Sequence, residues 1–359
     1  MRVLTLFAFC LFTSAACAEA TEPATRAIDF ATPISAVTVS PEGLSGIGKT
    51  GPAELINAVR LDTQRQNTAM LEEFGGLSSL FVRAIDGDTI LFDALTDQGH
   101  LARFSAPNPL TYGTAAPKTE TSVQLITLTD ASDKPLRGAN QIDSEGLAPT
   151  DTGFLISFER NHRLVELVKT EIGYKSQPGP SLTGFDGLEP NGGMEALTRL
   201  PNGQYLASAE YGPDRPGNPA SKLQAPYWVF DQSSKAVTAP LGSFENQGRF
   251  GITDIRVLGE DLWVLKRSYD PATKINLSRL ETCGLSSVLA GKPICAVKLT
   301  LSPPFPMDNY EGLAVMDDPK SGGKIVFILS DDNFSADQGT FLLAFRLDAP
   351  MPANTGATP

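Results

Sequence analysis

The chain has 359 residues and a formal net charge of −12, and its only two histidines are His100 and His162. An acidic chain without a basic run repels phosphate backbones, which argues against nucleic acid as a partner. Two histidines also argue against a zinc site. Hydrophobic residues make up 41% of the chain, enough for a core, whereas 32 glycines and 27 prolines are many for a helical protein.

The first twenty residues have the three parts of a secretory signal. Arg2 precedes the apolar run 3–12, and a segment of small residues follows this run. The segment fits the small-x-small rule for signal cleavage near Ala18 or Ala20. The apolar run is too short to span a bilayer, so we expect no transmembrane segment in the mature chain. Lipid attachment at Cys17 is the alternative. We therefore expect a periplasmic or secreted protein with a signal at 1–20 and an extension at 21–33.

Export determines how the cysteines are interpreted. Cys10 and Cys17 belong to the signal, which leaves Cys283 and Cys295 in the mature chain. Two cysteines twelve positions apart in an exported protein favour a local disulfide.

Most of the chain repeats one plan: a polar residue, a short apolar run, a turn, a second apolar run and another polar residue. The repeats begin at positions 78, 145, 195, 254 and 311, with separations of 67, 50, 59 and 57 residues. Short strands at this period, with Gly, Pro and Asp turns between them, are typical of β-propeller blades. We therefore predict an all-β fold with a single propeller over residues 34–348 and a disordered tail at 349–359.

The number of blades depends on residues 26–76. Segments 34–39 and 55–61 have the composition of strands. They form either a shortened sixth blade or the missing outer strand of the last blade, which would join the two ends of the chain. Full closure removes exposed strand edges, so we favour five blades closed by an N-terminal strand.

Equivalent positions of successive blades form rings around a propeller axis. The ring at the start of the first strands consists of Ser78, Glu145, Glu195, Asp254 and Glu311. The ring at the end of the second strands consists of Asp97, Glu159, Glu210, Arg267 and Asp331. The two strands of a hairpin pair antiparallel, so Glu311 and Asp331 should be neighbours.

These rings predict a site for a hard cation. Like charges this close require protonation, pairing or a cation, and carboxylate oxygens are ligands that Ca²⁺ prefers. The predicted metal ligands are Glu145, Glu195, Asp254, Glu311 and Asp331. The alternative is structural, because each carboxylate can accept backbone N–H bonds from a neighbouring turn.

Three further residues are candidates for catalysis. Glu159 and Glu210 would position water, and Arg267 would clamp an anionic group, since a guanidinium matches phosphate geometry. The alternative for Arg267 is an ion pair with Asp254. His162, which follows a strand, is a candidate general base or a surface histidine.

Several motifs together resemble a known family. They are Phe74-Gly75-Gly76-Leu77-Ser78, Asp143-Ser144-Glu145-Gly146-Leu147, Ser157-Phe158-Glu159, Asn309-Tyr310-Glu311-Gly312-Leu313 and Leu329-Ser330-Asp331-Asp332-Asn333-Phe334-Ser335. In their order, over roughly residues 70–347, they resemble the phytase-like propeller family, described as having esterase-like activity of phytase and known mainly from bacteria. The resemblance implies a propeller fold, export and calcium-dependent phosphoester hydrolysis. The chain departs from the family at Lys266-Arg267, where an acid often precedes the arginine.

The sequence supports hypotheses of different classes. The first is an exported, divalent-cation-dependent phosphoester or ester hydrolase that acts on a small anionic or ester substrate as a monomer. The chain has no Gly-x-Ser-x-Gly motif, so a metal-activated water is favoured over a serine nucleophile. The alternatives are a propeller that binds a ligand or a protein without catalysis, and a calcium-dependent lactonase.

Overall fold

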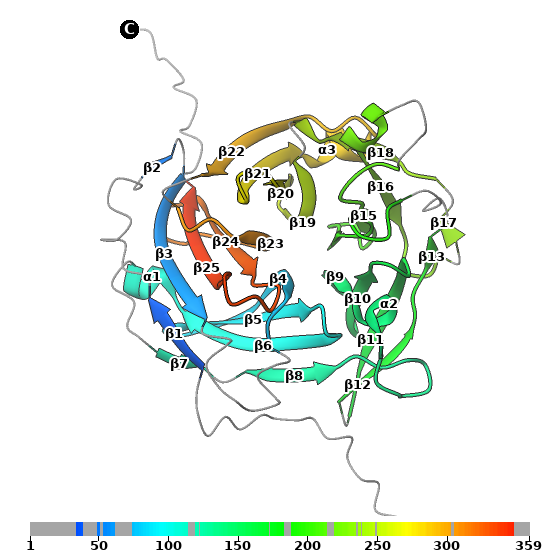
Figure 1. Ribbon diagram of the computed structural model, residues 1–359, viewed down its shortest axis with the longest axis horizontal. Helices are drawn as coiled ribbons and strands as arrows, with labels where there is room; N and C mark the ends of the chain where they lie inside the picture. The colour runs from blue at the N-terminus through cyan, green and yellow to red at the C-terminus, as the bar shows by residue number, and fades with distance from the viewer. Residues whose placement is uncertain are drawn as a thin grey trace, which may run out of the picture.

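The structure is a computed structural model. It describes residues 34–38, 49–50, 53–61, 74–113, 119–121, 123–171, 173–182, 188–213, 219–234, 236–237, 239–247, 250–302 and 305–347. Five antiparallel sheets stand in a ring and form the blades of a β-propeller (Figure 1). The predicted five-bladed all-β fold is therefore confirmed. The predicted signal, N-terminal extension and C-terminal tail lie outside the described residues.

The first four blades each consist of four strands in chain order from the centre outward. The first blade contains β4 (Leu77–Asp86), β5 (Thr89–Thr96), β6 (His100–Pro107) and β8 (Gln124–Thr127). The second contains β9 (Ser144–Pro149), β10 (Gly153–Phe158), β11 (Arg163–Thr170) and β12 (Gly173–Pro178).

The third and fourth blades follow the same order. The third contains β14 (Ala196–Arg199), β15 (Tyr205–Ser208), β16 (Gln224–Phe230) and β18 (Gly242–Glu245). The fourth contains β19 (Gly251–Leu258), β20 (Asp261–Asp270), β21 (Ile275–Gly284) and β22 (Cys295–Leu301). A separate parallel pair, β13 (Ser181–Leu182) with β17 (Ala236–Val237), lies beside these blades.

The fifth blade joins the two ends of the chain, as predicted. Its inner strands are β23 (Asn309–Asp317), β24 (Lys324–Asp331) and β25 (Thr340–Leu347). β3 (Ala53–Leu61) pairs antiparallel with β25 and supplies the fourth strand. β1 (Ile34–Thr38), β2 (Lys49–Thr50) and β7 (Thr119–Thr121) extend this sheet further. The edge of β25 is thereby paired rather than exposed.

The core is divided among the interfaces between blades, because each central sheet is apolar on both faces. In β24, Ile325, Phe327 and Leu329 pack in the cluster shared with the first blade. The alternate residues Val326 and Ile328 pack in the cluster shared with the fourth blade. This alternation, with a period of two residues, is what a strand buried on both faces requires.

The remaining regular structure is short. The helices are α1 (Pro109–Tyr112), α2 (Ala139–Ile142), α3 (Leu285–Leu289) and a 3₁₀ helix (Pro219–Leu223). Among the described residues, none of these helices has the length and apolar character needed to cross a membrane. Cys283 and Cys295 lie opposite each other on β21 and β22 and form the predicted disulfide. An internal disulfide is compatible with export.

Candidate acidic site on the propeller axis

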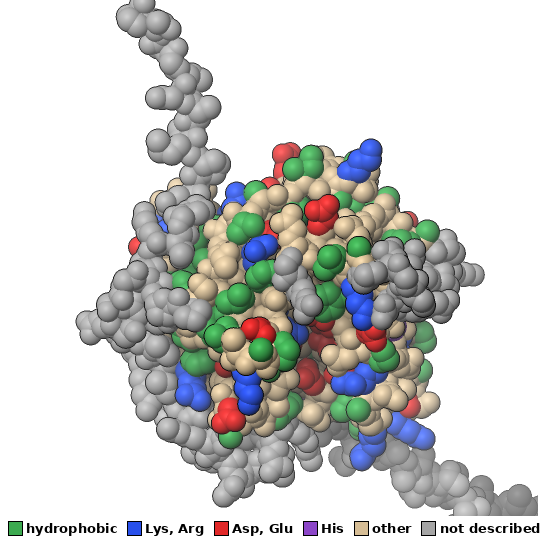
Figure 2. Space-filling view, turned by 45° about the horizontal axis from the view of Figure 1, so that its top comes forward, with side chains coloured by type: hydrophobic (Ala, Val, Ile, Leu, Met, Phe, Trp, Pro, Cys, Tyr) green, Lys and Arg blue, Asp and Glu red, His purple; other side chains and the backbone are tan. Residues whose placement is uncertain are grey.

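A cavity of about 670 Å³ opens where the inner strands begin. Figure 2 shows acidic side chains deep in this central hollow. Ten of its lining residues are carboxylic acids, namely Asp97, Asp143, Glu145, Glu159, Glu195, Glu210, Asp308, Glu311, Asp331 and Asp337. Its basic lining residues are Arg160, Arg267 and Lys274. The cavity therefore carries a strong excess of negative charge.

β-Bulges direct two of these acids into the cavity. In the fifth blade the register of β23 and β24 shifts between Tyr310 and Gly312, so Glu311 is the extra residue. In the second blade the register of β9 and β10 shifts over the segment that contains Glu145 and Gly146. An extra residue in one strand re-aims its side chain. Glu145 and Glu311 therefore point toward the axis.

The fourth blade corrects one predicted position. Its bulge lies between Ile252 and Asp254, so Thr253, not Asp254, is equivalent to Glu311. A shift of one residue turns a side chain to the opposite side of a strand. Asp254 is fully buried and does not line the cavity. We therefore remove Asp254 from the candidate metal ligands.

Asp254 instead forms a buried ion pair with Arg256, and neither residue lines the cavity. Oδ1 of Asp254 lies 2.7 Å from Nη1 of Arg256, and Oδ2 of Asp254 accepts a hydrogen bond from the Leu313 N–H at 2.8 Å. Burial raises the pKa of Asp254 to about 7, although Arg256 and the backbone donors lower it. The pair with Arg267 that the sequence suggested is not formed, because Arg256 occupies that role.

Arg267 bridges two other acids across the axis. Its Nη2 lies 3.2 Å from Glu311 and 3.5 Å from Glu210. Burial lowers the pKa of Arg267, but the charges of Glu311 and Glu210 outweigh burial and raise it. For Glu210, burial raises the pKa to about 7, with Arg267 acting in the opposite direction. Arg267 therefore neutralises part of the charge on this side of the cavity.

Asn309 joins the two acids of the fifth blade. Its Nδ2 donates to Glu311 Oε1 at 2.9 Å and to Asp331 Oδ2 at 3.0 Å. The prediction that Glu311 and Asp331 are neighbours is confirmed. Both carboxylates are thus already engaged within the protein.

Glu159 accepts hydrogen bonds from backbone N–H groups, which is the structural role that the sequence left open as an alternative. Its Oε1 accepts hydrogen bonds from the Gly192 and Gly193 N–H groups, each at 2.5 Å. Gly192 has φ +93°, a conformation that favours glycine. Burial raises the pKa of Glu195 well above its usual range, and the adjacent Glu159 raises it further. Glu159 thus ties the second blade to the loop before the third.

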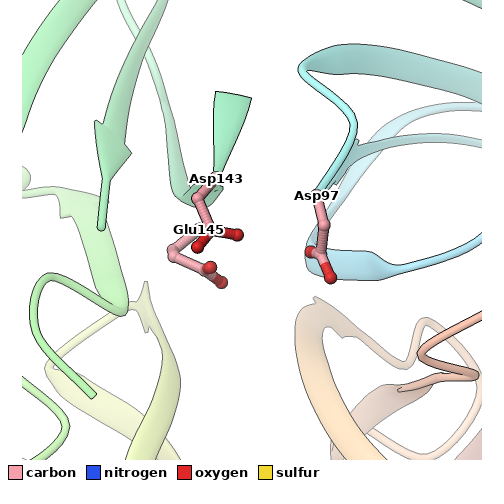
Figure 3. Close-up of side chains that lie close together, drawn as sticks. All are labelled: Asp97, Asp143 and Glu145. Carbon is pink, nitrogen blue, oxygen red and sulfur yellow. The ribbon is translucent and has the colours of Figure 1, made fainter. Parts of the chain in front are cut away.

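The first and second blades bring together three acids with fewer partners. Ligand oxygens of Asp97, Asp143 and Glu145 all lie within 4.8 Å of one another. Figure 3 shows Asp97 facing Asp143 and Glu145 across a gap. Glu145 is only 7% exposed. No described residue donates a hydrogen bond to its carboxylate.

Asp143 was absent from the predicted ligands, although a signal for it exists. Asp143 precedes Glu145 by two positions, as Asn309 precedes Glu311 in the fifth repeat. A polar residue at this position in two repeats indicates a shared role. Comparison of the two motifs would therefore have identified Asp143.

The three acids have the electrostatics of a cation site. Burial raises the pKa of Glu145 well above its usual range, and the charges of Glu159 and Asp97 raise it further. Burial is also the main cause that raises the pKa of Asp97, and the charges of Asp331 and Glu311 raise it further. A divalent cation would offset this repulsion. All donors of the set are oxygen atoms, and one of them belongs to Glu145, which is 7% exposed and has no hydrogen-bond donor among the described residues, so the set fits a hard metal ion.

His162 lies outside the acidic cavity. It lines a second cavity of about 340 Å³, together with Arg163. Its Nε2 lies 3.2 Å from the Glu189 carbonyl oxygen. The structure therefore gives His162 no place beside the carboxylates, and we do not retain it as a general base.

The sequence model of the Phytase-like family, described as "Esterase-like activity of phytase", matches residues 72–334. The chain belongs to this family. The match covers the first four blades and the strands β23 and β24 of the fifth, and it contains every acid of the two predicted rings. No curated protein matches the sequence significantly.

Similar solved structures include sugar-cleaving enzymes. The catalytic domain of a GH62 α-L-arabinofuranosidase from Coprinopsis cinerea has a TM-score of 0.45 and 11% identity, covering 79% of this chain and 95% of that one. An exo-1,5-α-L-arabinanase from a bovine ruminal metagenomic library has a TM-score of 0.41 and 9% identity, covering 76% and 93%. At these scores their substrates carry no information about this Phytase-like chain.

Proposed function

We propose that this Phytase-like protein is an exported, divalent-cation-dependent hydrolase of phosphoesters or esters that acts in the acidic cavity. The observation that carries the proposal is the cluster of Asp97, Asp143 and Glu145, in which Glu145 is 7% exposed, lines the cavity and receives no hydrogen bond from any described residue. A buried charge without a partner is unfavourable, so such a site favours a ligand of opposite charge. We take Ca²⁺ as the ion because every donor is oxygen.

The ligand set differs in part from the one predicted. Glu145 remains, Asp97 joins it from the position directly after β5 in the first blade, and Asp143 joins it from the position directly before β9. Glu311 and Asp331 are already engaged by Asn309, so we assign them to the wall of the cavity. When bound, the ion would polarise the ester and lower the pKa of a bound water.

The protein's own residues would orient the substrate. Arg267 lines the cavity and its side chain is 23% exposed, so its guanidinium is within reach of an anionic group. Glu210 lies beside it, with a pKa raised by burial to about 7, and is the better candidate to hold a proton or a water. Glu159 is the weaker candidate, because two backbone N–H groups already bind it.

The charge of the cavity explains the expected cation dependence. Ten acids against three basic residues repel an anionic ester. Binding of a divalent ion reduces this repulsion, so chelation should weaken substrate binding as well as chemistry.

The test is hydrolysis of p-nitrophenyl phosphate, p-nitrophenyl acetate and a lactone by protein freed of metal and then supplied with Ca²⁺. We expect turnover that chelation abolishes and that Glu145→Gln lowers at least 100-fold. Asp337→Asn is the matched control, because Asp337 lines the same cavity at its exposed rim. Absence of turnover with any divalent ion would refute the proposal.

The second candidate function is ligand binding without catalysis. The engagement of Glu159 by backbone N–H groups and of Arg267 by two acids favours it, since both residues already serve the fold. In that case Ca²⁺ raises the melting temperature, but none of the three substrates is hydrolysed.

A further inference from the structure

Arg160 is the basic residue bound to the three-acid cluster. Its Nε donates to Asp143 Oδ2, and its Nη2 donates to Asn191 Oδ1 at 3.2 Å. Its own N–H donates to the Pro190 carbonyl oxygen at 2.9 Å. The Arg160 backbone is therefore anchored, while its guanidinium binds one carboxylate oxygen of Asp143, a residue of the candidate ion site.

The two arginines of the cavity differ in how firmly they are held. Arg267 lies between Glu210 and Glu311, and its side chain is 23% exposed. The side chain of Arg160 is 37% exposed, and Asp143 is its one ion-pair partner among the described residues. An exposed guanidinium with one carboxylate partner is easier to displace than a buried one with two.

We propose that Arg160 is a tethered cation that competes with a divalent metal ion for Asp143, so that the ion binds only when the guanidinium moves away. Three observations carry this proposal: Arg160 binds the carboxylate of Asp143, which belongs to the candidate ion site; the side chain of Arg160 is exposed; and Glu145 beside them is 7% exposed and receives no hydrogen bond from any described residue. Arg160 thereby sets the ion concentration at which the site fills. The inference rests on the proposed ion site.

Coulomb repulsion gives the direction of the effect. A guanidinium that remains on Asp143 would lie next to a doubly charged ion in a partly buried cavity, where such repulsion is poorly screened. Removal of the Arg160 charge should therefore strengthen ion binding, whereas removal of an ordinary ligand residue would weaken it.

The experiment is calorimetric titration of metal-free protein with Ca²⁺ alone. We expect Arg160→Gln to lower the Kd about tenfold, and Arg160→Lys, which keeps the positive charge, to stay closer to the unaltered protein. Arg163→Gln is the matched control, because it removes the same charge from a residue that lines the other cavity. We expect Arg163→Gln to change the Kd less than twofold.

The outcomes separate this inference from the proposed function. If Arg160→Gln binds Ca²⁺ no more tightly than Arg163→Gln, the competition is refuted even if hydrolysis depends on Ca²⁺. If Arg160→Gln binds more tightly and no variant hydrolyses the ester substrates, the competition stands and the hydrolase proposal falls. If no variant binds Ca²⁺, both are refuted.

Discussion

The ion pair of Asp254 and Arg256 predicts a large effect on stability, because it connects blades that are distant in sequence. Arg256 donates to the Leu80 carbonyl oxygen in the first blade and to the Leu197 carbonyl oxygen in the third. Asp254 accepts from the Leu313 N–H in the fifth blade. Both side chains are buried, at 8% and 0% exposure. The variant Arg256→Met removes the cation while keeping most of the side-chain volume.

The expected loss follows from the groups left behind. A buried carboxylate without its partner costs about 3–5 kcal/mol, and each unbonded carbonyl adds about 1 kcal/mol. With two such carbonyls, we therefore expect Arg256→Met to lower the free energy of unfolding by roughly 5–7 kcal/mol above pH 7, a large share of a typical domain's stability. Asp254→Asn combined with Arg256→Met should lose less than the sum of the two single changes.

The pH dependence separates charge from packing. The pKa of Asp254 is raised by burial to about 7, and removal of Arg256 would raise it further. A raised pKa means that the folded state binds the proton more tightly, so stability falls as pH rises from the unfolded pKa to the folded one. In Arg256→Met this fall continues above pH 7, so the difference from the unaltered protein should be larger at pH 8.5 than at pH 5.5.

The measurement is urea unfolding followed by the fluorescence of Trp228 and Trp263, both buried in the folded protein. Arg199→Met is the control, since Arg199 pairs with the exposed Asp151 and should contribute less than about 1 kcal/mol. A loss below about 1 kcal/mol for Arg256→Met at pH 8.5, or a loss that does not depend on pH, would contradict this reasoning.

Two further predictions concern the disulfide and the acidic cavity. Replacement of both Cys283 and Cys295 by Ala should lower the free energy of unfolding by about 2–3 kcal/mol, as expected for a bridge across twelve residues. Urea unfolding curves that coincide for the variant and the unaltered protein would contradict this prediction. The pKa of Glu210 is raised by burial to about 7, so stability should fall between pH 4.5 and 7. Saturating Ca²⁺ should reduce this loss of stability. The loss is measured as the change in melting temperature between pH 4.5 and 7, with and without Ca²⁺.

The repeated hairpin plan was sufficient to predict the architecture. Antiparallel pairing places Glu311 beside Asp331 in any hairpin of this length, and the composition of segment 55–61 indicated the closing strand now seen as β3. The pairing of Cys283 with Cys295 followed from their spacing and the expected export. Each of these features depends on residues that are close in sequence or on the need to cover a strand edge.

The positions of the acids depended on details that a sequence pattern does not contain. A bulge adds one residue to a strand and moves every following side chain to the other face, so the sequence did not show that Thr253 rather than Asp254 takes the position of Glu311. Contacts between blades are likewise decided by the closed ring. They bring Asp97 to Asp143 and place Arg256 between Leu80 and Leu197.

The sequence by itself determined that this protein is a β-propeller with acids gathered at one end of its axis, because strand periodicity and hairpin geometry are local properties. It favoured five blades over six, and the closed ring of five sheets decided the number. Only the tertiary structure decided which acids are already engaged, such as Glu159 and Glu311, and that Glu145 receives no hydrogen bond from the part of the chain that the structure describes. The reason is physical: the partners of these carboxylates come from loops and blades that meet only when the ring closes.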